Sequence, residues 1–278
     1  MLAMHQIPSP RNWARGFTLI ELVMTMAIAA ILVAVTALNV RQPVEGYIDA
    51  ANNGRLANAA LTATQFMRRE LREALPNSVR VTQSGGKIYL EFLHTVSAGR
   101  YRVGAPGNVI DFTSSSAGNF DILTPAIKVP AGSYVVIYNL GIPGDNAYAG
   151  DNLRSVTTSG TALTSISYAA GSGPFPIDPP NHRFMIVDTP VTYVCNPDAA
   201  NPQLGTIARY SGYPVSLIQP TSFNGATSSL IASGVSGCTI TYTAGTTQRE
   251  GLVSMSLTLA EASATARLYS QVGIDNEP

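Results

Sequence analysis

The residues of this chain best placed to do chemistry are Gly16, Phe17 and Glu21, at the start of a long apolar run. The run spans residues 17–40, where 19 of 24 residues are apolar and Glu21 is the single charge. A carboxylate at that depth in a bilayer costs on the order of 2.5 to 3.5 kcal/mol, so we expect it to have a partner. A cut between Gly16 and Phe17 supplies one, because the new α-amino group lies one helical turn from Glu21. In a helical bundle, the amine of a neighbouring subunit is an equivalent partner.

Other interpretations of this junction stay open. The chain is conceivable as an uncleaved signal anchor, or as a secretory signal that is cut after the small residues at 35–37. An ordinary secretory signal keeps its charges before the apolar stretch. Neither interpretation accounts for Glu21, although a glutamate that snorkels toward the lipid headgroups is the simplest structural alternative.

The two cysteines, Cys195 and Cys238, are too few for a disulfide-built scaffold or a cysteine-only zinc site. They border predicted strands of a segment that we expect to be exported to an oxidising compartment. We therefore predict a disulfide between them, worth about 3 to 4.7 kcal/mol by loop entropy. The alternative is a thiol nucleophile, for which His182 is the only histidine in that half of the chain.

Metal and catalytic sites are weakly indicated. The histidines His5, His94 and His182 show no zinc spacing. Asp145 and Asp151 lie in a stretch of Gly, Asp and Asn that offers oxygens to calcium, but turns use the same residues and the spacing is not that of an EF-hand. Neither a nucleophile elbow nor a phosphate loop occurs, so we expect no cofactor, no metal and no enzymatic activity. A binding face is conceivable for four loop aromatics, namely Tyr148, Phe175, Tyr210 and Tyr213.

The N-terminal elements must hold the candidate cleavage site at a membrane. Residues 17–40 are long enough to span a bilayer as a helix, which needs about 20 apolar residues. Arg11 and Arg15 precede the run and predict a cytoplasmic N-terminus, with the chain exported after about residue 41. Residues 1–16 are then a leader that is cleaved.

Residues 41–75 are predicted to continue this helix as an amphipathic one, because nine of their 35 residues are charged and the apolar ones follow helical spacing. We expect this stripe to bury against the exported domain, while Glu70 falls inside it without a reason in the sequence. Pro43 and Gly46 should kink or locally melt the helix. The stripe consists of Ile48, Leu56, Ala59, Ala63, Met67, Leu71 and Ala74.

Residues 76–278 contain 15 of the 18 prolines and 21 of the 24 glycines, which marks a change from helix to sheet. The fold class is therefore α+β, with a long N-terminal helix packed on an antiparallel sheet head. Alternating residues on both sides of Gly85-Gly86 predict a hairpin. Further strands are expected at 134–140, 183–187, 191–195, 206–210, 238–242, 252–259 and 267–272.

The charge balance limits the partners of the whole chain. It has 17 basic and 17 acidic residues, and only 12% of its residues are charged, against roughly a quarter in ordinary globular proteins. A nucleic-acid binder needs a basic excess to neutralise phosphates. We therefore expect no nucleic acid among the partners.

The segment Gly-Phe-Thr-Leu-Ile-Glu-Leu at 16–22, after a short basic leader, resembles the type IV prepilin signature. The resemblance implies that a prepilin peptidase cuts after Gly16 and methylates the amine of Phe17, and that Glu21 docks the subunit. It also implies a pilin-like fold, a single-pass inner-membrane precursor held in lipid, and later a place in a pilus filament at the cell surface. The implied partners are the prepilin peptidase and methyltransferase, other major and minor pilins, and the inner-membrane assembly platform.

Three later stretches resemble one branch of that family, namely residues 44–50 with 68–80, residues 138–141 with 144–148, and the segments around Cys195, 209–213 and Cys238. The branch is the O-type minor pilins of the mannose-sensitive haemagglutinin (MSHA) pilus. It implies a minor pilin that helps to initiate or cap the pilus and contributes to adhesion. J-type pseudopilins of type II secretion and W-type minor pilins are similar in size and plan, and an adhesin or receptor head on a pilin mount also stays open.

Overall fold

The computed structural model describes residues 16–245, 250–262 and 264–278. The basic leader residues Arg11 and Arg15, and His5, lie outside the described residues. The chain divides into two compact units after Ala51. Each unit is described by itself below.

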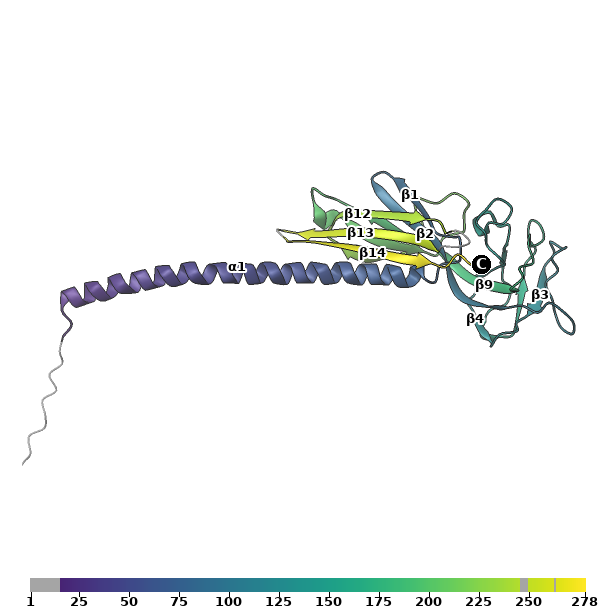
Figure 1. Cartoon of the computed structure of the whole chain (residues 1–278), viewed down its shortest axis with the longest axis horizontal. Helices are drawn as coiled ribbons and strands as arrows, with labels where there is room; N and C mark the ends of the chain where they lie inside the picture. Colours follow the sequence, from purple (N-terminus) through teal and green to yellow (C-terminus); the bar gives the residue numbers. More distant parts are fainter. Residues whose placement is uncertain (1–15, 246–249, 263) are drawn as a thin grey trace, which may run out of the picture. The chain divides into compact units, whose positions relative to one another are not determined.

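The long helix α1 runs from Leu19 to Leu71 and contributes to both units (Figure 1). The helix is continuous across Pro43 and Gly46, so the predicted local melting at these residues is wrong. A proline removes a single backbone donor, and the helical residues on both sides maintain the remaining ladder. The helix ends before the predicted residue 75, because residues 72 and 73 form a turn and Ala74 pairs with His94.

In the second unit, one stripe of α1 is buried as predicted. Leu56, Ala63, Met67 and Leu71 are at most 5% exposed. The predicted stripe was wrong at Ala59, which is exposed, because Ala60 takes that place at 0% exposure. The prediction was also wrong at Ile48, which belongs to the first unit and is 51% exposed.

The strands of the second unit are all paired in antiparallel fashion. The largest sheet has seven strands, with β1-β2-β9-β10-β11 in order and β5 and β6 attached beside β9. Its members are β1 (Arg80–Ser84), β2 (Lys87–Arg100), β5 (Tyr134–Val136), β6 (Leu153–Ser155), β9 (Arg183–Asn196), β10 (Thr206–Ser211) and β11 (Thr227–Ser233). A three-stranded sheet consists of β12 (Val235–Thr243), β13 (Gly251–Glu261) and β14 (Ala264–Ile274). Two small sheets pair β3 (Gly118–Asp121) with β8 (Ser165–Tyr168) and β4 (Ile127–Val129) with β7 (Gly160–Leu163).

The α+β class and the first hairpin are confirmed, since Ser84 pairs with Lys87 across Gly85 and Gly86, both at positive φ. The predicted strand 134–140 is wrong beyond Val136, because Tyr138 at φ 54° turns the chain. The two strands predicted between 183 and 195 form one strand, β9.

β9 accommodates Pro190 opposite Leu93, beside a register shift. A missing donor is tolerated where the ladder is already interrupted. Five short strands (β3, β4, β6, β7 and β8) and β11 escaped sequence analysis, because four residues or fewer show no clear alternation and the sequence of β11 is rich in serine.

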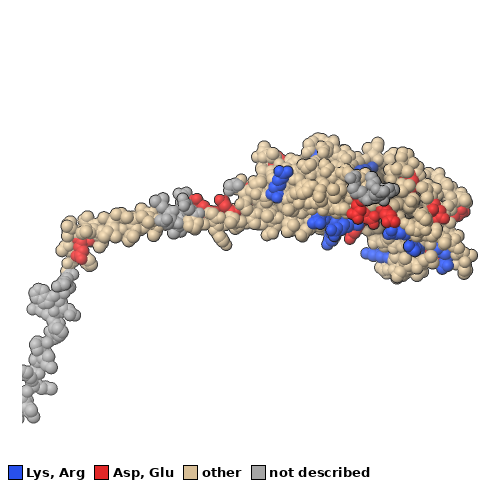
Figure 2. Space-filling model, viewed as in Figure 1, with Lys and Arg blue, Asp and Glu red and all other residues tan. Residues whose placement is uncertain are grey.

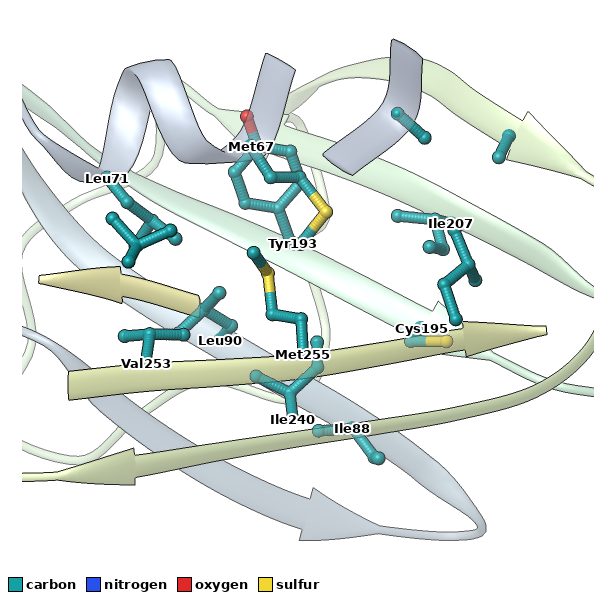
Figure 3. Packing of buried hydrophobic residues seen from close by; sticks show 14 of the residues in the cluster. Met67, Leu71, Ile88, Leu90, Tyr193, Cys195, Ile207, Ile240, Val253 and Met255 are labelled. Atoms are coloured by element: carbon teal, nitrogen blue, oxygen red, sulfur yellow. The ribbon is translucent and has the colours of Figure 1, made fainter. Parts of the chain in front are cut away.

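The main core lies where α1 and both larger sheets meet. Figure 3 shows Met67 and Leu71 of α1 together with Leu90 and Tyr193 of the large sheet, and Met255 of the three-stranded sheet, in one cluster. All five are at most 2% exposed. This packing fixes residues 52–71 of the helix on the head.

A second core lies in the chain between β2 and β9. It is rich in aromatic rings, among them Phe120 and Phe184 with centroids 5.0 Å apart, and Tyr168 and Phe175 at 5.5 Å. The small sheets β3-β8 and β4-β7 belong to this part of the head. The head therefore consists of a helix-backed sheet core and an aromatic insertion.

The predicted disulfide between Cys195 and Cys238 is confirmed. It joins β9 of the large sheet to β12 of the three-stranded sheet. Both thiols are used, so the alternative of a cysteine nucleophile is wrong. The cross-link holds together the two sheets that enclose the main core.

Candidate processing and assembly site

The N-terminus of α1 is built by Thr18 and Glu21. Thr18 directly precedes the helix, and its Oγ1 accepts a hydrogen bond from the backbone N–H of Glu21 at 3.3 Å. The carbonyl of Thr18 accepts the first helical bond from Leu22 at 3.2 Å. Thr18 is therefore the N-cap residue, which satisfies a backbone donor that the first turn leaves free, and Thr-x-x-Glu has the spacing of a capping box. Sequence analysis missed this role, although the three-residue spacing signals it.

The candidate cleavage junction is exposed. Phe17 is 79% exposed, and the position that a Cβ would take on Gly16 has no atom within 4 Å. A peptidase therefore meets no steric obstacle from the described part of the chain at this bond. Glu21 lies in the first turn of α1, where the helix dipole favours a negative charge.

The apolar side chains after the junction contact little of their own chain. The stretch Leu19–Ala37 is long and apolar enough to cross a membrane, and none of it is buried. Leu19 is 82% exposed and Val33 66%. A helix that is apolar on all sides requires lipid or other helices around it. This surface and the capped acid together form the candidate assembly segment.

In the head, the helix is held by an ion pair that explains Glu70. Its carboxylate accepts from Nε of Arg209 at 2.9 and 3.1 Å and from the hydroxyl of Tyr193. The side chains of Glu70 and Arg209 are only 12% and 19% exposed. Burial and the bond to Glu70 raise the pKa of Tyr193, so it stays a neutral donor. Glu70 is tolerated in the apolar stripe because its partners, Tyr193 of β9 and Arg209 of β10, face it there.

His94 fastens the end of the helix to the sheet. Its Nδ1 lies 2.9 Å from Oδ1 of Asp188, and its Nε2 lies 3.2 Å from Oε2 of Glu73. The bond to Asp188 raises the pKa of His94, against the opposing effect of burial. The backbone reinforces the contact, since Thr95 N donates to Glu73 O at 2.8 Å. His94 is therefore structural in this arrangement.

The two weak calcium candidates are both hydrogen-bonded to neighbouring groups of the chain. Asp145 is 3% exposed, accepts from Asn152 at 2.5 Å, and burial raises its pKa to about 6. Asp151 accepts from the backbone N–H of Asn146 at 3.1 Å and so helps to shape a turn. No group of three or more His, Cys, Asp or Glu able to hold a metal ion occurs among the residues that the structure describes.

The other sequence candidates have partners within the head. His182 lies 3.3 Å from Asp178, and Cys195 is disulfide-bonded, so the two do not form a dyad. The hypothesis of an aromatic binding face is wrong, because hydrophobic packing takes those rings inward. Tyr148, Phe175 and Tyr213 are at most 9% exposed, and Tyr210 stacks on Phe223 at 4.6 Å.

The comparison with known families agrees with this geometry. Residues 14–37 match a family model described as the prokaryotic N-terminal methylation motif. The match covers the candidate junction, the capped acid and the exposed apolar helix. No curated protein and no solved structure matches the chain.

The motif, the apolar helix and the α+β head support a type IV prepilin-like protein, either a pilin-like subunit or a pseudopilin. The motif points to a structural subunit rather than an enzyme, and it implies processing by prepilin peptidase and assembly with other pilins. The exposed apolar helix is consistent with membrane anchoring.

Proposed function

We propose that this protein is a minor pilin of an MSHA-type type IV pilus, which helps to initiate or cap the filament and contributes to adhesion. In this proposal, residues 1–16 are a leader, Gly16–Phe17 is the cleaved bond, and the amine of Phe17 becomes methylated. The mature subunit starts in the inner membrane with its N-terminus cytoplasmic. It then moves into a filament at the cell surface.

The observation that carries the proposal is the single acid in the exposed apolar helix. No residue of the described chain covers the stretch Leu19–Ala37, so neighbouring helices can replace lipid around it without unfolding the head. After cleavage, the amine of Phe17 on a neighbouring subunit pairs with Glu21 and fixes the register of that exchange. The large head, with its aromatic insertion, supports a specialised subunit.

The test of Glu21 can separate the charge from the helix cap, because the hydroxyl of Thr18 accepts from the backbone N–H of Glu21, which a substitution at position 21 keeps. Glu21→Gln keeps a side chain that can cap and removes only the charge. Thr18→Ala removes the cap and keeps the charge. We expect Glu21→Gln and Glu21→Ala to abolish incorporation into filaments, while Thr18→Ala retains it.

Incorporation is measured by immunoblotting of sheared filaments, with the membrane fraction as the control for expression. Normal incorporation of Glu21→Gln would refute the charge pairing. Failure of Thr18→Ala alone would show that incorporation needs the helix cap at Thr18 rather than the charge of Glu21.

Processing is tested at the glycine. A bulky substitution such as Gly16→Val should leave the precursor uncut, because the peptidase must approach the exposed backbone there. Intact-mass measurement distinguishes the precursor from a mature chain that begins with N-methylated phenylalanine. A mature mass from the Gly16→Val variant would contradict the assigned bond.

The second candidate is a J-type pseudopilin of a type II secretion system. It shares the motif and the exposed helix, so the same Glu21 variants would affect it. Deletion of the gene separates the two: a loss of surface pili supports the pilus, and a loss of exported enzymes with normal pili supports secretion.

A further inference from the structure

The outer face of the three-stranded sheet carries an uncovered aromatic ring. Tyr269 of β14 is 62% exposed. Among the described residues of 52–278, it is the only phenylalanine or tyrosine that is exposed, because packing takes the other rings at least partly inward. Tyrosine combines a large apolar surface with a polar end, and for this reason it is enriched where proteins bind partners. The ring is therefore a candidate contact surface.

The residues around this ring are polar. Residues that pair directly across antiparallel strands lie on the same face of the sheet. We give the name platform to three such pairs of β14 and β13, namely Arg267 with Thr258, Tyr269 with Ser256, and Gln271 with Ser254. On the third strand, Thr239 and Thr241 of β12 continue the same rows and are exposed. A row of hydroxyl groups thus lies beside the ring.

Hydrogen bonds hold the long side chains of the platform in place. Nε2 of Gln271 donates to Oγ of Ser254 at 3.1 Å and to the hydroxyl of Tyr269 at 2.7 Å. Nε of Arg267 donates to Oγ of Ser256 at 3.2 Å. These contacts fix the side chains before a ligand arrives, so less rotamer entropy is lost on binding.

The same groups keep polar capacity for a ligand. A serine hydroxyl that accepts one hydrogen bond still has its own O–H to donate. The two terminal nitrogens of Arg267 and the carbonyl oxygen of Gln271 take no part in the contacts above. The platform therefore offers both donors and acceptors on the two sides of an exposed ring.

The charges at the platform balance. Among the described outward positions of β12, β13 and β14, Arg267 is the single charged residue. Beyond Gln271, the carboxylate of Glu250 lies 2.5 Å from the position that a Cβ would take on Gly273. Over the area where Figure 1 draws these three strands, most atoms in Figure 2 are uncharged. One cation and one acid leave no net charge to attract a charged polymer.

This combination selects among classes of partner. Nucleic acids and anionic membranes need several basic groups. An apolar protein surface would bury the serine and threonine hydroxyls without hydrogen-bond partners, which costs free energy. A neutral sugar chain satisfies both parts of the platform, because the C–H groups of a pyranose ring cover the tyrosine and the sugar hydroxyls exchange hydrogen bonds with its polar neighbours. Equatorial linkages make such a chain a flat ribbon, which suits an open sheet face.

We infer that the platform binds a neutral polysaccharide of equatorially linked hexoses. Tyr269 stacks on one sugar ring, and Arg267 and Gln271 bind the hydroxyls beside it. The inference rests on the adhesive part of the proposed function and deepens it by naming the class of ligand and the residues that hold it. One platform on each subunit is sufficient, so it fits a protein present in few copies at the end of a filament.

The test measures binding of the purified full-length chain to immobilised polysaccharides by biolayer interferometry, in a detergent without a sugar headgroup. Hydroxyethyl cellulose is the neutral probe, and carboxymethyl cellulose has the same backbone with added carboxylates. We expect the wild type to bind hydroxyethyl cellulose. Tyr269→Ala should weaken this binding about tenfold, a loss typical of a central interface tyrosine. Arg267→Ala with Gln271→Ala should weaken it to a similar extent.

Two control variants isolate the role of the ring. Tyr269→Phe keeps the stacking surface and should retain most of the binding. Tyr47→Ala removes a tyrosine that is 77% exposed on α1, outside the platform, and should leave binding unchanged. Near-ultraviolet circular dichroism checks that each variant is folded.

A wild-type chain that does not bind hydroxyethyl cellulose would overturn the inference. Equal binding by Tyr269→Ala and Tyr47→Ala would do the same. Stronger, salt-sensitive binding to carboxymethyl cellulose would also overturn it, because the platform would then serve an anionic ligand. Cleavage at Gly16 and incorporation through Glu21 are measured separately, so failure of the platform is distinguishable from failure of the proposed assembly role.

Discussion

The prediction that tests the docking of α1 most directly is the replacement of Glu70 by alanine. Glu70 is charged yet lies in the buried stripe of the helix, where it accepts from Arg209 of β10 and Tyr193 of β9. The substitution leaves the guanidinium, only 19% exposed, without its carboxylate. It also leaves the Tyr193 hydroxyl, in a core residue at 0% exposure, without its acceptor.

The size of the effect follows from this burial. Removing one partner of a buried ion pair costs about 3 to 5 kcal/mol, because the other charge stays uncompensated. Since 12% of Glu70 and 19% of Arg209 remain exposed, water relieves part of the cost. We therefore expect Glu70→Ala to lower the free energy of unfolding by about 3 kcal/mol. Replacing both groups, as Glu70→Leu with Arg209→Met, should cost less, because neither charge is then left unpaired.

The assay is urea unfolding of the full-length chain in detergent, followed by near-ultraviolet circular dichroism of the head. The matched control is Glu261→Ala, whose pair with Arg55 is 43% and 60% exposed. An exposed pair is worth about 0 to 1 kcal/mol. If Glu70→Ala cost no more than Glu261→Ala, or if the double replacement cost more than the single one, the interpretation of Glu70 as a buried anchor would be refuted.

Two further predictions concern pH and redox state. Asp188 and Glu73 stabilise the imidazolium of His94, so the pKa of His94 is raised above 6.5 in the folded protein. The contribution of His94 to the free energy of unfolding is therefore fully present below pH 6.5 and is lost as the pH rises through the folded pKa. The stability difference between the wild type and His94→Gln, from urea titrations, should therefore be larger at pH 5.5 than at pH 8.5, and an equal difference would contradict the charged clamp. Replacing Cys195 and Cys238 together by serine should lower the free energy of unfolding by about 3 to 4.7 kcal/mol, because the loop between two sheets is released. Chemical reduction of the wild type should reproduce that loss in the same titration, and a loss below about 1 kcal/mol would contradict the loop-entropy argument.

The sequence alone was sufficient for features that depend on neighbours along the chain. The junction at Gly16 and Phe17, the acid at Glu21 and the apolar helix follow from residue type and short-range spacing. The hairpin around Gly85 follows for the same reason, since a two-residue turn and alternating side chains fix its register. The capping role of Thr18 could also have been predicted from the local sequence, because it depends on the spacing between Thr18 and Glu21.

Apart from the disulfide, contacts between residues that are distant in sequence could not be predicted, because only the folded chain brings them together. Glu70 looked misplaced because its partner Arg209 is 139 positions away, and only the packing of the helix on β9 and β10 joins them. The sequence suggested that the loop aromatics form an exposed binding face, yet the insertion between β2 and β9 buries rings such as Phe175 in a core of its own. Hydrophobic burial depends on which surfaces meet, and local spacing does not encode that.

The sequence by itself therefore determined the long apolar helix, the N-terminal methylation motif and the class of the head, because each rests on chemistry within a few residues. The tertiary structure decided how the helix is anchored, that the loop aromatics are buried, and that the disulfide joins two sheets. The reason is physical: a side chain's exposure and partners are properties of the packed chain, and a residue such as Glu70 meets its partners only when β9 and β10 pack against the helix.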